Sequence, residues 1–294
     1  MRTLHFTKME GCGNDYVYVN GFAEKVPQAE KPALVRRLSD RHFGIGGDGV
    51  IFINPIEGAD AEMEMYNADG TRGEMCGNGI RCVAKYVADR GIVTKNPMTI
   101  ISYGQTKILT LTKDGDGKTV KVRVNMGSPI LETKDVPTTA APNRKIGSAD
   151  AAVSVPITVQ GKEYEMTCVS MGNPHAVVFV DDVEHFDVNG IGPDFEHHAL
   201  FPKRVNTEFV QVVDESHVKM RVYERGTGET LACGTGACAT AVACILNGKT
   251  GSRVEVELLG GTLSIEWDGV QGDSFAPVFM TGPATEVFSG EIEY

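Results

Sequence analysis

Two cysteines, each followed by a glycine-x-glycine pattern, are the residues of this sequence best suited to chemistry. Cys76 begins Cys-Gly-Asn-Gly, and Cys233 begins Cys-Gly-Thr-Gly at a separation of 157 residues, from 76 to 233. A cysteine at the N-terminus of a helix meets unpaired amide donors and a partial positive charge, which stabilise its thiolate. Such surroundings bring a thiol pKa from about 8.5 into a range of roughly 3.5–7.5. Each motif therefore predicts a cysteine that can exchange a proton near neutral pH.

Two such cysteines on opposite sides of one ligand would invert a stereocentre. One thiolate would remove the α-proton of an amino acid from one face, while the second thiol would deliver a proton to the other face. The amides that follow each cysteine would bind the substrate carboxylate and stabilise the carbanion in a closed, dry site. We therefore predict an amino-acid racemase or epimerase that uses no cofactor and no metal.

The elements that must position these cysteines are themselves repeated. Residues 61–65 alternate apolar and polar side chains, as do residues 218–222, and this is the period of a half-buried strand. Tyr66-Asn67 ends the first strand, and Tyr223-Glu224 ends the second at the same separation of 157 residues, from 66 to 223. Each half therefore predicts a strand, a glycine-containing turn, the cysteine motif and a helix.

The helices expected after the two cysteines differ in their apolar pattern. The first has apolar residues at helical spacing, which predicts one buried stripe at Ile80, Val83, Ala84, Val87 and Ala88. The second, over residues 237–246, is small or apolar on almost every face, so a sheet wrapped round it should enclose it. Short strands are expected at residues 98–103, 107–112, 120–125, 176–180 and 253–258. Residues 136–150 are expected to form an exposed connection near the domain boundary.

Composition narrows the class of protein. The chain has 294 residues, of which 41% are hydrophobic, enough for two globular domains with sizeable cores. With 39 acidic and 28 basic residues its net charge is −11, the wrong sign for a nucleic-acid partner. The sequence has neither a signal-peptide pattern nor a long apolar segment, so we expect no membrane partner. An odd number of cysteines, seven, argues against a disulfide framework and favours the cytoplasm.

The cysteines have two other interpretations. A lone cysteine is usually a small buried hydrophobic residue, but packing alone has no need to repeat the flanking glycines. A thiol-rich redox or metal-binding protein is the alternative from a different class. Cys82, Cys238 and Cys244 each lie five or six residues from the preceding cysteine. At about 100° per residue this spacing turns them away from one another, which disfavours a shared metal site.

Further motifs connect the sequence to a known family. The two cysteine motifs, the second within Gly228–Gly236, occur together with Gly13-Asn14-Asp15, Arg41–Gly46, Asn67–Gly70, Gly172–His175, Arg204–Thr207 and Glu224-Arg225-Gly226. This set closely resembles the diaminopimelate epimerases, nearly from end to end. The resemblance implies an α/β (α+β) fold of two pseudo-symmetric domains, each a β-barrel-like sheet around a central helix, with the active site in the interdomain cleft. The halves would be residues 1–126, joined by the C-terminal segment 282–294, and residues 127–281.

The resemblance also implies an activity and a role for each site residue. The activity is cofactor-independent interconversion of LL- and meso-diaminopimelate in lysine and cell-wall precursor biosynthesis, by a homodimer. Cys76 and Cys233 would be the acid and base. The amides of Gly77, Asn78, Gly234 and Thr235 would hold the carboxylate at the reacting centre. The residues that would bind the rest of the substrate are Asn14, Asn67, Asn173, Asn206, Glu224 and Arg225. His175 and Glu224 would tune the thiol pKa values, and Arg225 would bind a distal carboxylate through two parallel hydrogen bonds.

Simpler explanations exist for several of these residues taken alone. An asparagine beside glycine or proline often forms a turn, His175 could be a hydrogen-bonded structural residue, and Arg225 could be a solvated surface charge. Proline racemase and hydroxyproline epimerase share the two-cysteine logic and remain an alternative, although their first motif typically carries histidine in place of Asn78. Gly49 stands where many diaminopimelate epimerases have a substrate-contacting glutamine, so that contact is not expected here.

Overall fold

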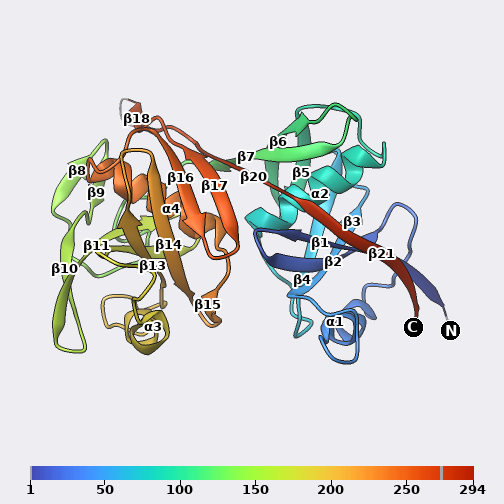
Figure 1. The fold of residues 1–294 in the computed structure, drawn as a ribbon, viewed down its shortest axis with the longest axis horizontal. Helices are drawn as coiled ribbons and strands as arrows, with labels where there is room; N and C mark the ends of the chain where they lie inside the picture. The colour runs from blue at the N-terminus through green and yellow to red at the C-terminus, as the bar shows by residue number, and fades with distance from the viewer. Residues whose placement is uncertain (1, 272–273) are drawn as a thin grey trace. The chain divides into compact units, whose positions relative to one another are not determined.

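The structure, a computed structural model, describes residues 2–271 and 274–294. The chain forms two compact units, Met1–Val124 with Thr281–Tyr294, and Asn125–Met280. The C-terminal strand β21 (Thr285–Glu293) pairs antiparallel with the first strand β1 (Thr3–Gly11), so the end of the chain lies in the first unit (Figure 1). Among the described residues, no helix is both long enough and apolar enough to cross a membrane.

The first unit is one curled sheet with a helix against it. From β21 the strands follow in the order β1, β2, β3, β4, β5, β6 and β7, with β2–β3 and β4–β5 parallel. Helix α2 packs against β1, β2, β5 and β6, and the short helix α1 packs against β2, β3 and β4. The bounds are β2 Asn14–Asn20, α1 Lys31–Ser39, β3 Gly49–Asn54, β4 Ala61–Asn67, α2 Gly77–Asp89, β5 Met98–Ser102, β6 Gln105–Lys113 and β7 Thr119–Gly127.

Helix α2 is buried more completely than its sequence predicts. The expected single stripe is wrong, because almost every residue from Gly77 to Val87 is buried, Arg81 included. Arg81 is fully buried, and its guanidinium donates to the carbonyls of Pro283 (2.9 Å) and Gly77 (3.2 Å). A charged side chain can be buried when its donors are satisfied in this way. The pattern of apolar residues did not predict that α2 is a central helix, because Arg81 counts as a polar residue.

The second unit repeats this plan around helix α4 (Gly234–Leu246). Strands β11, β12, β13, β14, β16 and β17 all contact α4, and its residues 236–244 are buried. The predicted enclosure of this helix is confirmed. The other bounds are β8 Arg144–Ile146, β9 Ala149–Ala151, β10 Val155–Val159, β11 Lys162–Ser170, β12 Pro174–Phe179, α3 Val188–Glu196, β13 Asn206–Val212, β14 His217–Glu224, β15 Gly228–Thr230, β16 Arg253–Leu258, β17 Gly261–Glu266, β18 Val270–Gln271, β19 Ser274–Phe275 and β20 Val278–Gly282.

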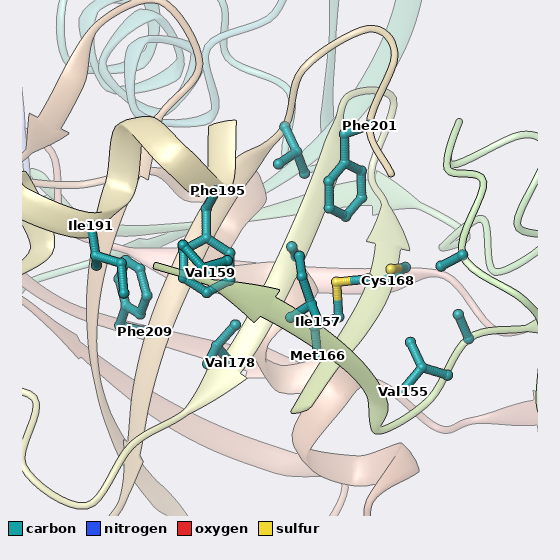
Figure 2. Close-up of a cluster of buried hydrophobic side chains, with 14 of the residues drawn as sticks. Val155, Ile157, Val159, Met166, Cys168, Val178, Ile191, Phe195, Phe201 and Phe209 are labelled. Atoms are coloured by element: carbon teal, nitrogen blue, oxygen red, sulfur yellow. The ribbon is translucent and has the colours of Figure 1, made fainter. Parts of the chain in front are cut away.

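A large apolar cluster lies between this sheet and helix α3 (Figure 2). Phe195 of α3 packs edge-on against Phe209 of β13 at 5.5 Å between ring centroids. Val136 belongs to the same cluster and is fully buried, and residues 144–151 form the β8–β9 hairpin. The expectation of an exposed connection at 136–150 is therefore right for residues 141–145 and wrong for the ends of the segment, where Val136, Ala140 and Ile146 are buried. Cys168 also lies in this cluster as an ordinary packed side chain.

The two units match strand by strand. In the first, β2 runs parallel to β3 with Tyr16 opposite Gly49, and in the second β12 runs parallel to β13 with His175 opposite Asn206. Each pair continues into an antiparallel strand, β4 or β14, which ends before the cysteine motif. The predicted mixed α/β fold with two similar halves is confirmed.

Candidate active site

Both cysteines occupy the N-cap of a helix of 13 residues, in almost the same backbone conformation. Cys76 has φ −120° and ψ 111°, and Cys233 has φ −119° and ψ 110°. The amide of Gly79 donates to the sulfur of Cys76 at 3.2 Å, and the amide of Gly236 donates to the sulfur of Cys233 at 3.4 Å. The predicted position at a helix N-terminus is confirmed for both thiols, and each helix start stabilises negative charge on its sulfur.

The second glycine of each motif is required by close packing. A Cβ atom on Gly79 would lie 2.8 Å from Cδ1 of Ile51, and one on Gly236 would lie 2.6 Å from Oε1 of Glu208. Both approaches are shorter than ordinary carbon contacts, so a side chain here would displace Ile51 or Glu208, and glycine lets the helix start rest on the strand beneath it. The two contacts also show that Ile51 and Glu208 occupy the same place in the two units.

In the first unit, Cys76 is only partly buried. Its thiol donates to Oδ1 of Asn14 at 3.1 Å, and Nδ2 of Asn14 donates to Asp48 at 2.7 Å. Arg41 binds both Asp15 (2.7 Å) and Asp48 (2.9 Å). Asn14 therefore contacts the thiol directly, and a charged network outside it fixes the direction of its carboxamide.

The other two polar residues of the first half-site have partners of their own. Asn67 ends β4 with an exposed side chain, and its Nδ2 donates to Thr71 at 3.0 Å. The side chain of Asn78 is buried against Gly11. A ligand at the start of α2 would accordingly meet the backbone amides of Gly77 and Asn78, and not the Asn78 carboxamide.

In the second unit, Cys233 is buried, with 6% of its surface exposed, and lies among charged groups. Burial raises the pKa of its thiol well above the ordinary value, and the carboxylates of Glu224 and Glu208 raise it further. The hydroxyl of Thr235, 3.5 Å from the sulfur, and the Gly236 amide act in the opposite direction. The lowered thiol pKa that the motif predicts is therefore wrong for Cys233, because burial and two carboxylates outweigh the effect of the helix start.

Glu224 stands beside Cys233 at the end of β14. Burial raises the pKa of this carboxyl, and hydrogen bonds from Thr230 and Cys233 partly offset that effect. A carboxylate next to a thiol disfavours the thiolate and can accept the thiol proton. The contact supports the pKa-tuning role that the sequence suggested for Glu224.

Asn206 and Arg225 are joined by the turn after β14. Oδ1 of Asn206 accepts from the Arg225 amide at 2.9 Å, while its Nδ2 donates to the Pro174 carbonyl at 2.9 Å. Asn206 thus holds the backbone of the turn. The Arg225 side chain is exposed, and its guanidinium donates to the Lys203 carbonyl at 3.2 Å, which leaves further donors to bind a carboxylate.

His175 is fully buried and reaches Cys233 only through other residues. Its Nδ1 lies 2.7 Å from Oε1 of Glu208, and its Nε2 lies 3.0 Å from Oδ1 of Asn173. Glu208, also fully buried, is a site residue that the sequence analysis missed. The available signal was an acidic residue within the otherwise buried strand Asn206–Val210, at the position where the first unit has Ile51. Among the described residues, no group of three or more His, Cys, Asp or Glu side chains is placed to hold a metal.

Comparison of the sequence with known proteins gives one family. The chain matches the diaminopimelate epimerase family over residues 6–132 and 167–287. It is 53% identical over 290 residues to the diaminopimelate epimerase of Agathobacter rectalis and 51% identical over 291 residues to that of Acetivibrio thermocellus. Each alignment covers 99% of this chain and 99% of the relative.

Solved structures with much lower identity share the fold. A phenazine biosynthesis protein of the PhzF family from Bacillus anthracis matches with a TM-score of 0.71 and 16% identity over 100% of both chains. A probable proline racemase from Agrobacterium radiobacter K84 matches with a TM-score of 0.69 and 16% identity, over 99% of this chain and 93% of the other. These similarities describe the architecture of the two units.

Proposed function

The chain belongs to the diaminopimelate epimerase family, and on that premise we propose that Cys76 and Cys233 exchange the α-proton of the substrate. Its activity is the interconversion of LL- and meso-diaminopimelate, a small-molecule amino acid used in lysine biosynthesis. The observation that carries the proposal is the duplicated N-cap, in which each sulfur accepts a hydrogen bond from the amide three residues later.

The two thiols take complementary roles in one turnover. Cys76 as thiolate accepts the α-proton, the electron pair of the broken C–H bond remains on carbon, and the thiol of Cys233 then protonates that carbon from the opposite face. The inverted product leaves Cys76 protonated and Cys233 as thiolate, and the reverse reaction uses the same steps backwards. The raised pKa of Cys233 supports its starting role as the proton donor.

The carboxylate beside the reacting carbon binds between the two helix starts. The amides of Gly77 and Asn78 donate from one side, and those of Gly234 and Thr235 from the other. Helix N-termini favour a carboxylate, and they favour the doubly charged carbanion state still more in a site without water. This preferential stabilisation of the carbanion takes the place of the electron sink that a cofactor would supply.

The distal end of diaminopimelate carries a second carboxylate and a second ammonium group. Arg225, with its exposed guanidinium, binds that carboxylate, and Asn14, Asn67, Asn173 and Asn206 supply amide donors and acceptors around it. Glu224 accepts from an ammonium group and, with His175, adjusts the proton affinity of Cys233. The contacts of Asn14 with Cys76 and of Asn206 with the Arg225 turn support these positions.

The assembly of the site follows from its division between two units. We propose that residues 1–126 with 282–294 supply the Cys76 half, that residues 127–281 supply the Cys233 half, and that substrate closes them around itself. We further propose a cytoplasmic homodimer. Light scattering over a range of protein concentrations tests the dimer, and a mass of about 32 kDa, that of one chain, at all of them would refute it.

Deuterium incorporation tests the function directly. The protein is incubated in D2O with LL-diaminopimelate, and separately with L-proline, without added cofactor. We expect α-deuteration and the meso isomer from diaminopimelate only. Turnover of proline alone would overturn the substrate and leave the two-thiol mechanism in place, whereas no exchange with either amino acid would overturn both.

A further inference from the structure

Four side chains form a continuous line of hydrogen bonds that ends on the sulfur of Cys233. Glu208 contacts His175 at 2.7 Å, and His175 contacts Oδ1 of Asn173 at 3.0 Å. Nδ2 of Asn173 donates to the hydroxyl of Thr235 at 3.2 Å, and that hydroxyl lies 3.5 Å from the sulfur. All of these residues belong to the second unit.

The line has a direction. Oδ1 of Asn173 can only accept, so Nε2 of His175 donates to it, and a carboxylate can only accept, so Nδ1 donates to Glu208. The other end of the same carboxamide, Nδ2, must donate to Thr235. A hydroxyl that accepts there keeps its own proton for the sulfur, which makes Thr235 a donor to the Cys233 thiolate.

We propose that Glu208 is a positioning residue, which holds His175 as a donor at both ring nitrogens and so directs the Thr235 hydroxyl toward the Cys233 thiolate. The proposal rests on the two-thiol function above. In Glu208→Gln no negative charge holds a second proton on the His175 ring. The amide oxygen of the new side chain accepts from Nδ1 and keeps the remaining proton there, so Nε2 needs a donor. The Asn173 carboxamide turns over to supply one, its oxygen faces Thr235, and the hydroxyl donates to that oxygen and not to sulfur.

The packing of the fold does not explain Glu208. The first unit has Ile51 at the equivalent place under its own helix start, and replacing a buried ion pair with apolar residues is often neutral or stabilising. Both Glu208 and His175 are fully buried, and Oε2 of Glu208 has no hydrogen-bond partner among the described residues. A costly charge at this point is explained by what it does to the thiol next to it.

Two effects of Glu208 on Cys233 have opposite signs. As a nearby charge, Glu208 disfavours the thiolate, together with Glu224. As the start of the line, it favours the thiolate through Thr235. The ionisable groups facing this thiol are Glu224 from β14 and Glu208 from β13, with His175 of β12 behind Asn173. In Glu208→Gln the second ring proton of His175 leaves together with the charge of Glu208, so the two opposite charges are lost as a pair. The loss of the Thr235 hydrogen bond then raises the pH at which Cys233 reacts.

Alkylation by iodoacetamide at a series of pH values, with each cysteine quantified by mass spectrometry, separates these effects without any turnover. For Glu208→Gln we expect the midpoint of Cys233 to rise by about one pH unit, the loss of one hydrogen bond to a charged sulfur, while Cys76 in the same molecules is unchanged. Glu229→Gln removes another ion-paired glutamate of this unit, partner of Arg221, and should shift neither cysteine. A fall or no change at Cys233 in Glu208→Gln would overturn the proposal.

The last link is tested by changing only the hydroxyl of Thr235. Thr235→Val should raise the Cys233 midpoint as Glu208→Gln does, Thr235→Ser should restore it, and adding Glu208→Gln to Thr235→Val should cause no further rise. If Thr235→Val leaves the pH midpoint of Cys233 alkylation unchanged, the proposal is overturned, even if Glu208→Gln does not fold. Because alkylation needs no substrate, an absence of epimerase activity would refute the proposed function and leave this result to be judged separately.

Discussion

The two cysteines occupy equivalent places in two copies of one backbone motif, and the residues around them differ in charge. Around Cys76 the equivalent positions hold Tyr16, Ile51 and Asn67, and around Cys233 they hold His175, Glu208 and Glu224. The hydrogen bond from the third amide is the same in both. The shared backbone thus stabilises negative charge on each sulfur, and the side chains of the strands beneath raise or lower the thiol pKa.

Each unit also buries a charged pair, but in different places. In the first unit Lys31 of α1 binds Glu64 of β4 at 2.5 Å, and Glu64 also accepts from Gln28 and Asn54. In the second, Glu208 binds His175 under the helix that Cys233 begins. We therefore expect the buried charge of the first unit to affect stability and that of the second to affect the chemistry of Cys233.

Removal of either thiol is expected to have the largest effect, because one group cannot serve both faces of the substrate. Cys76→Ala and Cys233→Ala should each lower the rate of epimerisation by about 10³-fold or more. Cys168→Ala, in the apolar cluster, is the control and should keep most of the activity. Full activity in either of the first two variants would break the comparison, because it would show that the two N-caps do not act as a pair.

Glu224→Gln tests the charge difference between the half-sites. Burial is the larger cause of the raised pKa of Cys233, and the Glu224 carboxylate is the next, so its loss should lower the pH midpoint of Cys233 alkylation. Epimerisation should fall by on the order of 10²-fold, since the variant also loses a proton acceptor. An unchanged midpoint would show that the charge of Glu224 does not reach the sulfur.

The buried pair of the first unit should affect stability and not chemistry. Burial alone would raise the pKa of Glu64, but hydrogen bonds from Lys31, Gln28 and Asn54 lower it to about 2. A depressed pKa adds stability above the unfolded value near 4.5, and this contribution is lost as the pH falls toward 2. Glu64→Gln should reduce the free energy of unfolding by about 2 kcal/mol at pH 7, and the difference should narrow at pH 3.

Urea unfolding at the two pH values measures that difference. Glu62→Gln is the matched control, because Glu62 lies on the same strand and accepts from the same Asn54 amide but is less buried. A difference that stays constant with pH would mean that the Lys31–Glu64 pair is not the cause. A loss of epimerase activity in folded Glu64→Gln would contradict the separation of structural from catalytic charge.

Local pattern was enough to predict much of this molecule. The cysteine N-caps, the strands that precede them and the enclosed helix α4 all follow from periodicity and from glycine placement within short segments of sequence. The two-domain α/β fold followed because the same pattern occurs twice. The proposed binding residues came from the resemblance, and among them Asn14 and Thr235 contact a thiol.

What sequence did not predict depends on contacts between distant segments. Helix α3 was not predicted, because its buried residues become an apolar face only where it packs on strands distant in sequence, among them β13 and β10. Arg81 concealed the burial of α2, since its partner Pro283 lies 202 residues away. Glu208 has no local motif, and its role depends on a histidine in the neighbouring strand and on Gly236 above it. Such relations exist only in the folded chain.

The glycines under the two helix starts give the finest test of the comparison. Alanine at Gly79 would meet the flexible end of Ile51 at 2.8 Å, whereas alanine at Gly236 would meet the Glu208 carboxylate at 2.6 Å. An apolar side chain can move aside, but Glu208 is held by His175. We expect both variants to lose stability in urea unfolding, Gly236→Ala by about 1 kcal/mol more than Gly79→Ala.

The matched double variant identifies the cause of that difference. In a Glu208→Ala background the obstruction above β13 is gone, so Gly236→Ala should cost about as little as Gly79→Ala does in the natural chain. If the cost of Gly236→Ala were unchanged by removing Glu208, the strain would lie in the helix backbone. The two helix starts would then differ in their own geometry, contrary to the equivalence of their N-caps.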